Sequence, residues 1–185
     1  MDDTAAVARA GAGDSEAFRL LIERHGRALY RLAYRMTGNA HDAEDVVQEA
    51  FLKAYRSLDR FEGRSQVGTW LHRITANCAL DALRARQRQE RHLVRSDHDT
   101  PPEPRAEEPG PDRWVAGGDV HRGVRVALGR MSPRERATFV LRHFEGLSLQ
   151  EIGQVLELDP EAVRQSICRA VRKARAVLAP LMGVV

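Results

Sequence analysis

The sequence has few cysteines, few aromatic residues and no long apolar segment. Its two cysteines, Cys78 and Cys168, lie far apart in helical patterns, which excludes a disulfide framework and a four-ligand zinc site, so we expect small buried or half-buried thiols. Aromatic residues make up 5% of the chain, which argues against a β-rich core. No stretch approaches the ~18 apolar residues that span a bilayer, and the amino terminus lacks a basic start followed by an apolar run. We therefore expect a cytoplasmic protein without stable membrane insertion.

Signatures of enzymes are also missing. The sequence contains no HExxH, GxSxG, P-loop or CxxC motif. His72 and Cys78 stand six residues apart on one predicted helix and do not share a face. We predict neither catalysis nor a metal, and no small-molecule cofactor.

The chain has many charged residues and many segments with helical periodicity. Charged residues make up 30% of the chain, the formal net charge is +3, and the arginines are clustered. Such clusters form local basic surfaces that suit an anionic partner such as nucleic acid. The 185 residues allow one ordinary domain or two small ones. We predict an all-α protein with two small helical domains, 1–95 and 120–185, joined by a flexible linker at 96–119.

The first domain is predicted to contain three helices. Apolar residues recur at three- and four-residue spacing from Asp14 until Gly38 ends the pattern. A second helix begins near Asp42, and a third runs over about 69–91 with a strongly basic last part. Trp70 fits the core of this domain better than an exposed position.

The segment 96–119 has a different composition. It contains five prolines, three glycines and seven acidic residues. Such a segment cannot bury enough apolar surface to offset the entropy lost on ordering. We predict an extended acidic tether, in which the lone Trp114 docks on either domain or on a partner. The domains should move independently unless internal docking or an inhibitor holds them together.

The second domain is predicted to contain a helix-turn-helix. Ser132 and Ser148 each open a helix with a capping box, and the second of these helices is short. A turn at 157–159 leads into a longer helix that Asp159 caps. A short helix, a tight turn and a longer helix form the motif whose second helix enters the major groove of DNA.

The outward face of this last helix is basic. Near its start Arg164 and Gln165 can read bases, since arginine bonds guanine and glutamine bonds adenine through two hydrogen bonds each. Arg172 and Lys173, farther along, are better placed for phosphates. A solvated basic face on an ordinary helix would explain the charge alone. The short capped helix and the turn before it favour DNA binding.

Residues of the first domain are less informative by themselves. The second helix carries an outward row formed by Asp45, Gln48, Glu49, Leu52 and Arg56. The third helix places Asn77, Asp81 and Arg84 near one stripe beside its basic end. A solvated surface and an exposed hydrogen-bonded cluster explain these rows equally well.

Two long runs resemble a known family. The run DAEDVVQEAFLKAYRSLDRF, followed by TWLHRITANCALDALRARQR, is similar to region 2 of extracytoplasmic-function (ECF) sigma factors of the sigma-70 family. The run from VALGRMSPRERATFVLRHFEGLSLQEIG to RQSICRAVRKARAVL is similar to their region 4. The two runs cover most of the chain outside the amino-terminal dozen residues and the linker. Their order, with a variable linker between them, is highly specific.

The resemblance implies a function in transcription initiation. Such proteins bind core RNA polymerase, through its β′ clamp and β flap, and promoter DNA, and an anti-sigma factor often controls them. The polymerase-binding row would be Asp45, Gln48, Glu49 and Leu52. The residues for the −10 element would be Gln66, Val67, Arg73, Asn77, Asp81, Arg84 and Arg86. Those for the −35 element would be Arg164, Gln165, Ser166, Arg169, Arg172 and Lys173.

The sequence departs from the family pattern in two places. Relatives commonly have an aromatic or bulky residue before the Thr-Trp pair, where this chain has Gln66-Val67-Gly68. In the last helix, Glu161 stands where relatives often have glycine, and Ser166 stands where they often have arginine. Glu161 can accept a hydrogen bond from a cytosine amino group or repel a phosphate. A helix-turn-helix regulator acting without polymerase is the alternative, but it leaves the first domain without a role.

Overall fold

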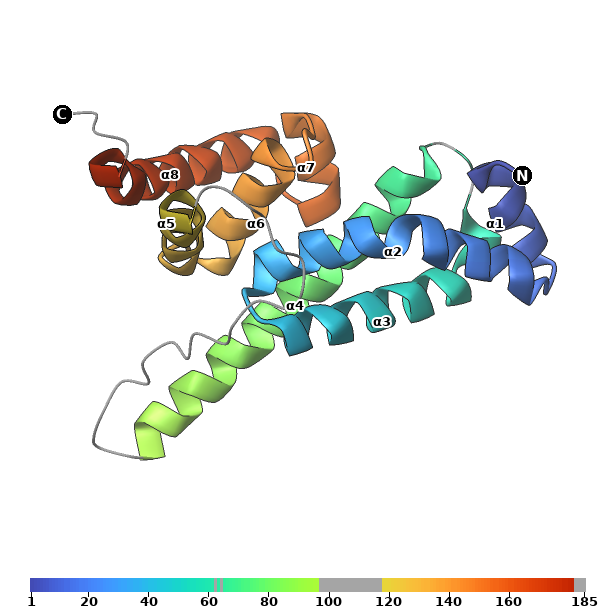
Figure 1. The fold of residues 1–185 in the computed structure, drawn as a ribbon, viewed down its shortest axis with the longest axis horizontal. Helices are drawn as coiled ribbons and strands as arrows, with labels where there is room; N and C mark the ends of the chain where they lie inside the picture. The colour runs from blue at the N-terminus through green and yellow to red at the C-terminus, as the bar shows by residue number, and fades with distance from the viewer. Residues whose placement is uncertain (62, 64, 97–117, 182–185) are drawn as a thin grey trace.

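The structure is a computed structural model that describes residues 1–61, 63, 65–96 and 118–181. Helices account for all its regular secondary structure within these ranges (Figure 1). The predicted all-α fold is confirmed. Residues 97–117 of the predicted acidic tether, including Trp114, lie outside the described residues, whereas Ser96, Gly118 and Asp119 belong to the helices on either side.

Within residues 1–61, 63 and 65–96, the amino-terminal half contains four α-helices and one short 3₁₀ helix, whose bounds are α1 (Asp3–Gly11), α2 (Ser15–Thr37), α3 (Ala40–Arg56), η1 (Leu58–Arg60) and α4 (Val67–Ser96). Asp14 caps α2 by accepting hydrogen bonds from the backbone of Glu16 and Ala17. Gly38 ends this helix in the left-handed conformation, at φ 76°. Helix α1 was not predicted. The sequence feature that indicates this helix is Asp2, whose side chain caps it by accepting a hydrogen bond from the Ala5 backbone.

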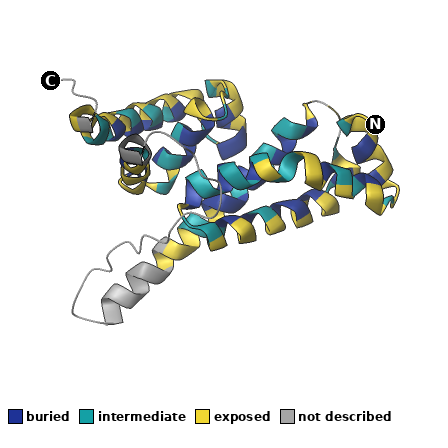
Figure 2. Ribbon diagram, in the orientation of Figure 1, coloured by how far each residue is buried: buried dark blue, intermediate teal, exposed yellow. Residues whose placement is uncertain are grey.

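The core of this half lies between α2, α3 and α4, whose facing sides are buried in Figure 2. Leu21 and Leu29 of α2 pack in one cluster with Phe51 of α3 and Leu71 of α4. Trp70 is 7% exposed and its ring centre lies 5.1 Å from that of Phe61. The expected core position of this tryptophan is confirmed.

The carboxy-terminal half consists of α5 (Gly118–Gly129), α6 (Pro133–His143), α7 (Leu149–Leu156), α8 (Pro160–Leu178) and the 3₁₀ helix η2 (Ala179–Leu181). Both predicted capping boxes are present, at Ser132 with Glu135 and at Ser148 with Glu151. Glu157 ends α7 with a left-handed backbone, at φ 54°. This residue begins the turn that leads into α8.

The two halves pack against each other. Helix α6 contacts α2 and α4, and α7 contacts α4. A single apolar cluster joins Met36 and Leu80 of the first half to Leu141 and Ile152 of the second. The sequence left open whether the two domains move independently or dock on each other. In this structure they are docked.

Candidate nucleic-acid interface

Helices α7 and α8 form the predicted helix-turn-helix. Val163, Ala170 and Ala174 of α8 are buried against the rest of the domain. Because a helix repeats every 3.6 residues, the intervening residues point outward. The exposed ones are Arg164, Gln165, Cys168, Arg169, Arg172 and Arg175. The first two turns of α8 therefore present the side chains proposed to read bases.

Two acidic residues form ion pairs with cationic side chains of α8. The Glu161 carboxylate accepts hydrogen bonds from Arg164 Nη1 at 2.9 Å and from Gln165 Nε2 at 3.4 Å. Glu135 of α6 lies beneath α8 and contacts Lys173 Nζ at 2.6 Å and Arg169 Nε at 3.6 Å. Burial raises the pKa of Glu135, but hydrogen bonds from Lys173 and Ser132 outweigh it and hold the pKa below its usual value.

Arg172 differs from these cations. No ion pair involves Arg172 within the described ranges, and its side chain is exposed. Lys173 is 41% exposed beside its partner Glu135. Arg172 is thus a better candidate for a phosphate contact than Lys173, which must share its charge with a carboxylate.

Two predictions about α8 are wrong. Ser166 is fully buried, and its hydroxyl accepts a hydrogen bond from Thr138 Oγ1 at 3.0 Å. It stands one turn before Ala170 on the inward side, so it stabilises the packing of α8 on α6 and does not face DNA. Cys168, expected to be buried or half buried, is exposed on the basic face, whereas Cys78 is buried as expected.

The second predicted DNA surface lies on α4. Arg73, Asp81, Arg84 and Arg86 are exposed, and Asn77 is half buried. Asp81 and Arg84 form an ion pair at 3.5 Å. Asn77, Asp81 and Arg84 share one side of α4 with Arg73, as the spacing of the first three predicted. Arg86 lies about 200° around the helix from Arg84 and pairs with Asp42 of α3 at 3.3 Å.

Of the two DNA contacts predicted at the start of α4, only one has an exposed side chain. Gln66 is exposed, but Val67 is 3% exposed and belongs to the same apolar cluster as Trp70. Val67 as a DNA contact is therefore wrong, because its side chain fills the core at the start of α4. Gln66 is the exposed side chain of this pair.

The predicted polymerase-binding row lies on the outer face of α3. Asp45, Gln48, Glu49 and Leu52 are all exposed, and Leu52 is 51% exposed. Tyr55 follows one turn later at 50% exposure and extends the apolar part of this row. Sequence reasoning missed Tyr55, although its spacing of three residues from Leu52 placed it on the same face.

An ion-pair cluster joins the two halves, and we call it the Glu145 contact. Glu145, just after α6, lies 3.2 Å from Arg35 Nη1 of α2 and 3.2 Å from His72 Nε2 of α4. The other ring nitrogen of His72 lies 2.7 Å from the Gly68 carbonyl oxygen. Since both nitrogens face oxygen acceptors, the doubly protonated ring fits this position.

Electrostatics agree with this geometry. The hydrogen bond to Glu145 raises the pKa of His72 against the opposing effect of burial. Burial raises the pKa of Glu145, but the hydrogen bond from His72 and the charges of His72, Arg35 and Arg31 bring it below its usual value. The pair is therefore strongest when both side chains are charged.

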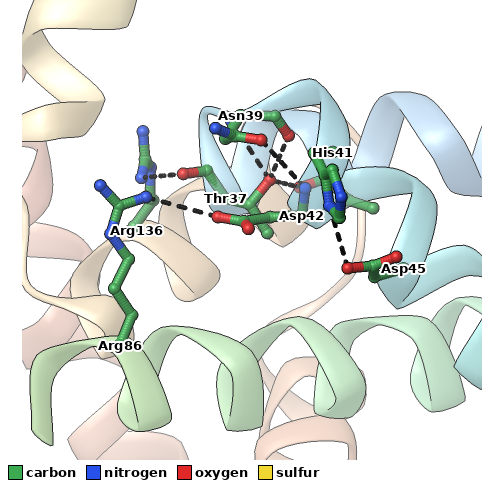
Figure 3. Close-up of polar contacts among 8 residues, drawn as sticks. Thr37, Asn39, His41, Asp42, Asp45, Arg86 and Arg136 are labelled. Atoms are coloured by element: carbon green, nitrogen blue, oxygen red, sulfur yellow. Dashed lines mark hydrogen bonds and ion pairs between the residues drawn. The ribbon is translucent and has the colours of Figure 1, made fainter. Parts of the chain in front are cut away.

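Arg136 of α6 makes a second polar contact between the halves, at the end of α2 (Figure 3). Its Nη1 donates to the Thr37 carbonyl oxygen at 3.4 Å. Its Nε is buried without a hydrogen-bond partner among the described residues. Desolvation, with the nearby charge of Arg86, lowers the pKa of Arg136 to about 10. This guanidinium is poorly compensated, so the docked arrangement includes an unfavourable contribution.

The described residues contain no group of three or more side chains suited to hold a metal ion. They also contain no helix long and apolar enough to span a membrane.

Both halves match known families. Residues 21–89 match Sigma-70 region 2, and residues 121–173 match Sigma-70 region 4. The chain is 32% identical to the RNA polymerase sigma-H factor of Pseudomonas aeruginosa, over 97% of this chain and 95% of that protein. It is 34% identical to the ECF RNA polymerase sigma-E factor of Escherichia coli K12, over 92% and 91%. It is 39% identical to the ECF sigma factor SigE of Mycolicibacterium smegmatis, over 86% of this chain but 60% of that protein.

Solved structures of similar proteins have the same fold. The structure of CnrH in complex with the cytosolic domain of CnrY is similar with a TM-score of 0.65 and 30% identity, over 96% of this chain and 97% of that one. The sigma factor RpoE of Bartonella quintana, solved with the anti-sigma factor NepR, has the same fold with a TM-score of 0.66 at 22% identity, over 87% and 96%. With two family regions in order and relatives above 30% identity along nearly their whole length, this chain belongs to the extracytoplasmic-function sigma factors.

Proposed function

We propose that this chain directs core RNA polymerase to promoters by reading the −35 element as duplex with α8 and the −10 element as an opened strand with α4. The observation that carries the proposal is the exposure of Arg164 and Gln165 on the first turns of α8, above a buried row that fixes the helix orientation. Side chains at this end of a recognition helix reach base edges in the major groove. Catalysis belongs to the polymerase.

The polar side of α4 would hold the unstacked −10 strand. Asn77 offers an amide that can both donate and accept, and Asp81 offers acceptors only. Arg73 and Arg84 are exposed on this side of α4 and would neutralise phosphates of the strand. Arg86 is exposed on another side of the helix, where it pairs with Asp42, and would join them only when that ion pair breaks. Unstacking a base costs a few kcal/mol, so these contacts must form in the opened state to offset it.

Helix α3 would attach the protein to the polymerase β′ clamp. Its exposed row combines two acids, an amide and the half-exposed Leu52, and Tyr55 adds a large apolar side chain. An apolar centre with a polar rim is the arrangement typical of specific protein interfaces. The carboxy-terminal half would contact the β flap.

The docked arrangement must open before both promoter elements are bound. Leu80 and Leu158 line one pocket, Asn77 lies one turn before Leu80, and Arg164 lies six residues after Leu158. Helix and chain dimensions therefore place the Asn77 and Arg164 backbones within about 30 Å of each other. The two elements are named for positions about 25 base pairs apart, or roughly 85 Å of duplex. Docking also places Arg84 beside Ser132 and Arg134 of the other half.

A separate inhibitor is part of the proposal. The similar RpoE was solved with an anti-sigma factor, and an inhibitor that grips both halves of this chain would keep the two promoter surfaces too close together. The site of action is the cytoplasm, where core polymerase and promoters meet.

Reconstitution with core polymerase tests the function. A randomised promoter library should yield one class of sequences, with a −35 and a −10 element, from which transcripts start only when this chain is present. Specific binding of duplex DNA by the free chain, with no effect of core polymerase, would instead support a regulator that acts alone.

A further inference from the structure

The single acidic residue of α8 lies between the two side chains proposed to read bases. Glu161 occupies the second position of the helix, and its side chain is 59% exposed. One carboxylate oxygen accepts from Arg164 Nη1 at 2.9 Å, and the other accepts from Gln165 Nε2 at 3.4 Å. The spacing of three and four residues is the one that brings helical side chains together.

We propose that Glu161 is a specificity-determining residue of the −35-reading helix, which positions Arg164 and Gln165 and opposes binding to duplexes that lack their bases. This inference rests on the proposed function of α8. Glu161 acts through its two neighbours, so it is a positioning residue for the base contacts.

Helix stability accounts for only a small part of this glutamate, since an exposed carboxylate in the first turn gains only modest stability from the helix dipole. The cap of α8 is Asp159, which accepts a hydrogen bond from the Ala162 backbone at 2.9 Å. An exposed ion pair on a helix surface adds little to folding. The remaining charged side chains of α8 are Arg164, Arg169, Arg172, Lys173 and Arg175, all cationic. A negative charge at the groove-facing end of so basic a helix works against affinity for DNA in general.

Two physical effects follow from this placement. First, the carboxylate holds the Arg164 guanidinium and the Gln165 amide in a defined orientation, which reduces the entropy lost when they meet base edges. Its bond to Gln165 occupies an amide hydrogen and leaves the amide oxygen open to accept a bond.

Second, the negative charge of Glu161 repels DNA phosphates whatever the base sequence. Only cognate bases give Arg164 and Gln165 hydrogen-bond partners that offset this repulsion. Specificity is a difference between two affinities, and a repulsive element raises it when it weakens non-cognate binding more than cognate binding. The structure thus favours an indirect role for Glu161 over direct reading of cytosine, because the two side chains that donate to its carboxylate are those proposed to read bases.

The test uses holoenzyme reconstituted from the full chain and core polymerase, with a library randomised over the −35 element. In Glu161→Ala the ratio of cognate to non-cognate binding should fall about fivefold or more, at the lower end of the range for one bidentate base contact. In Glu161→Gln non-cognate binding should strengthen, and the slope of log K against log salt should become steeper by about 0.9, as for one more neutralised phosphate. Since the glutamine side-chain oxygen can still accept from Arg164, this variant should keep more base preference than Glu161→Ala.

Two controls separate the possible failures. Glu157→Gln makes the same charge change in the preceding turn, where the structure shows no bond to Arg164 or Gln165, and should leave base preference unchanged. Arg164→Ala reports whether α8 reads the −35 element at all. Loss of preference in Arg164→Ala, together with unchanged preference and salt slope in both Glu161 variants, would overturn the inference. Unchanged preference in Arg164→Ala would instead overturn the proposed function of α8.

Discussion

Replacing Glu145 by glutamine should release the two halves of the protein from each other. The Glu145 side chain is 14% exposed, and among the described residues its ion pairs are with His72 and Arg35 of the other half. The change therefore weakens docking without removing an ion pair from within either half. A hydrogen bond to a charged group contributes about 1.5–3 kcal/mol. Since glutamine can keep one weaker bond, we expect a net loss of about 2 kcal/mol, which shifts the docking equilibrium roughly 30-fold.

Single-molecule energy transfer can measure this equilibrium. Cys168 is an exposed labelling site in the second half, and Glu23→Cys on α2 supplies one in the first, with the buried Cys78 replaced by alanine. The Glu145→Gln protein should show a larger low-transfer population than its parent. Glu157→Gln, an acid-to-amide change outside the Glu145 contact, is the matched control and should resemble the parent.

Docking should also depend on pH. The pKa of His72 is raised above 6.5, so its contribution is complete below that value and is lost as pH rises through the raised pKa. The pKa of Glu145 is lowered below 4.5, so its contribution is complete above that value and is lost as pH falls through the lowered pKa. Docking should therefore be strongest between about pH 4.5 and 6.5 and weaken toward pH 8. Equal transfer efficiencies in parent and Glu145→Gln at pH 6 would refute this account.

Three further changes probe the other surfaces. Combining Gln48→Ala with Leu52→Glu should weaken binding to core polymerase at least tenfold with unchanged circular dichroism; unaltered affinity would remove α3 from the interface. Arg172→Ala should weaken holoenzyme binding at all promoters and reduce the salt slope by about 0.9, and a sequence-dependent loss would contradict a phosphate contact. Ser166→Ala should lower the free energy of unfolding by about 1 kcal/mol, because Thr138 loses a buried partner, while −35 preference in holoenzyme footprints stays the same; a changed preference would restore Ser166 to the DNA surface.

The fold was largely predictable because its signals are local. Capping boxes at Ser132 and Ser148 and the glycine stop at Gly38 fix helix ends through contacts within a few residues. The docking of the two halves was not predictable in the same way. It depends on Glu145 meeting Arg35 and His72 across long sequence separations, and no periodicity encodes such a meeting.

The candidate site was predictable by helix face but less so by single residue. Arg164, Gln165 and Arg172 are exposed where the pattern placed them. Ser166 and Val67 were assigned by correspondence with family positions, and a small or β-branched side chain at such a position can turn inward where an arginine cannot. Burial of these two side chains is decided by packing against α6 and against the first-half core, which the local sequence does not report.

The most direct test of the central claim is the division of labour between α8 and α4. Reconstituted holoenzyme carrying Arg164→Ala or Asn77→Ala would be examined at several promoters by −35 footprinting and by permanganate reactivity of −10 thymines. Arg164→Ala should lose the −35 footprint, with a cost of about 1–3 kcal/mol in binding. Asn77→Ala should keep that footprint and lose thymine reactivity, because its partner exists only in the opened strand. A −35 footprint lost in Asn77→Ala, or kept in Arg164→Ala at every promoter, would contradict the account.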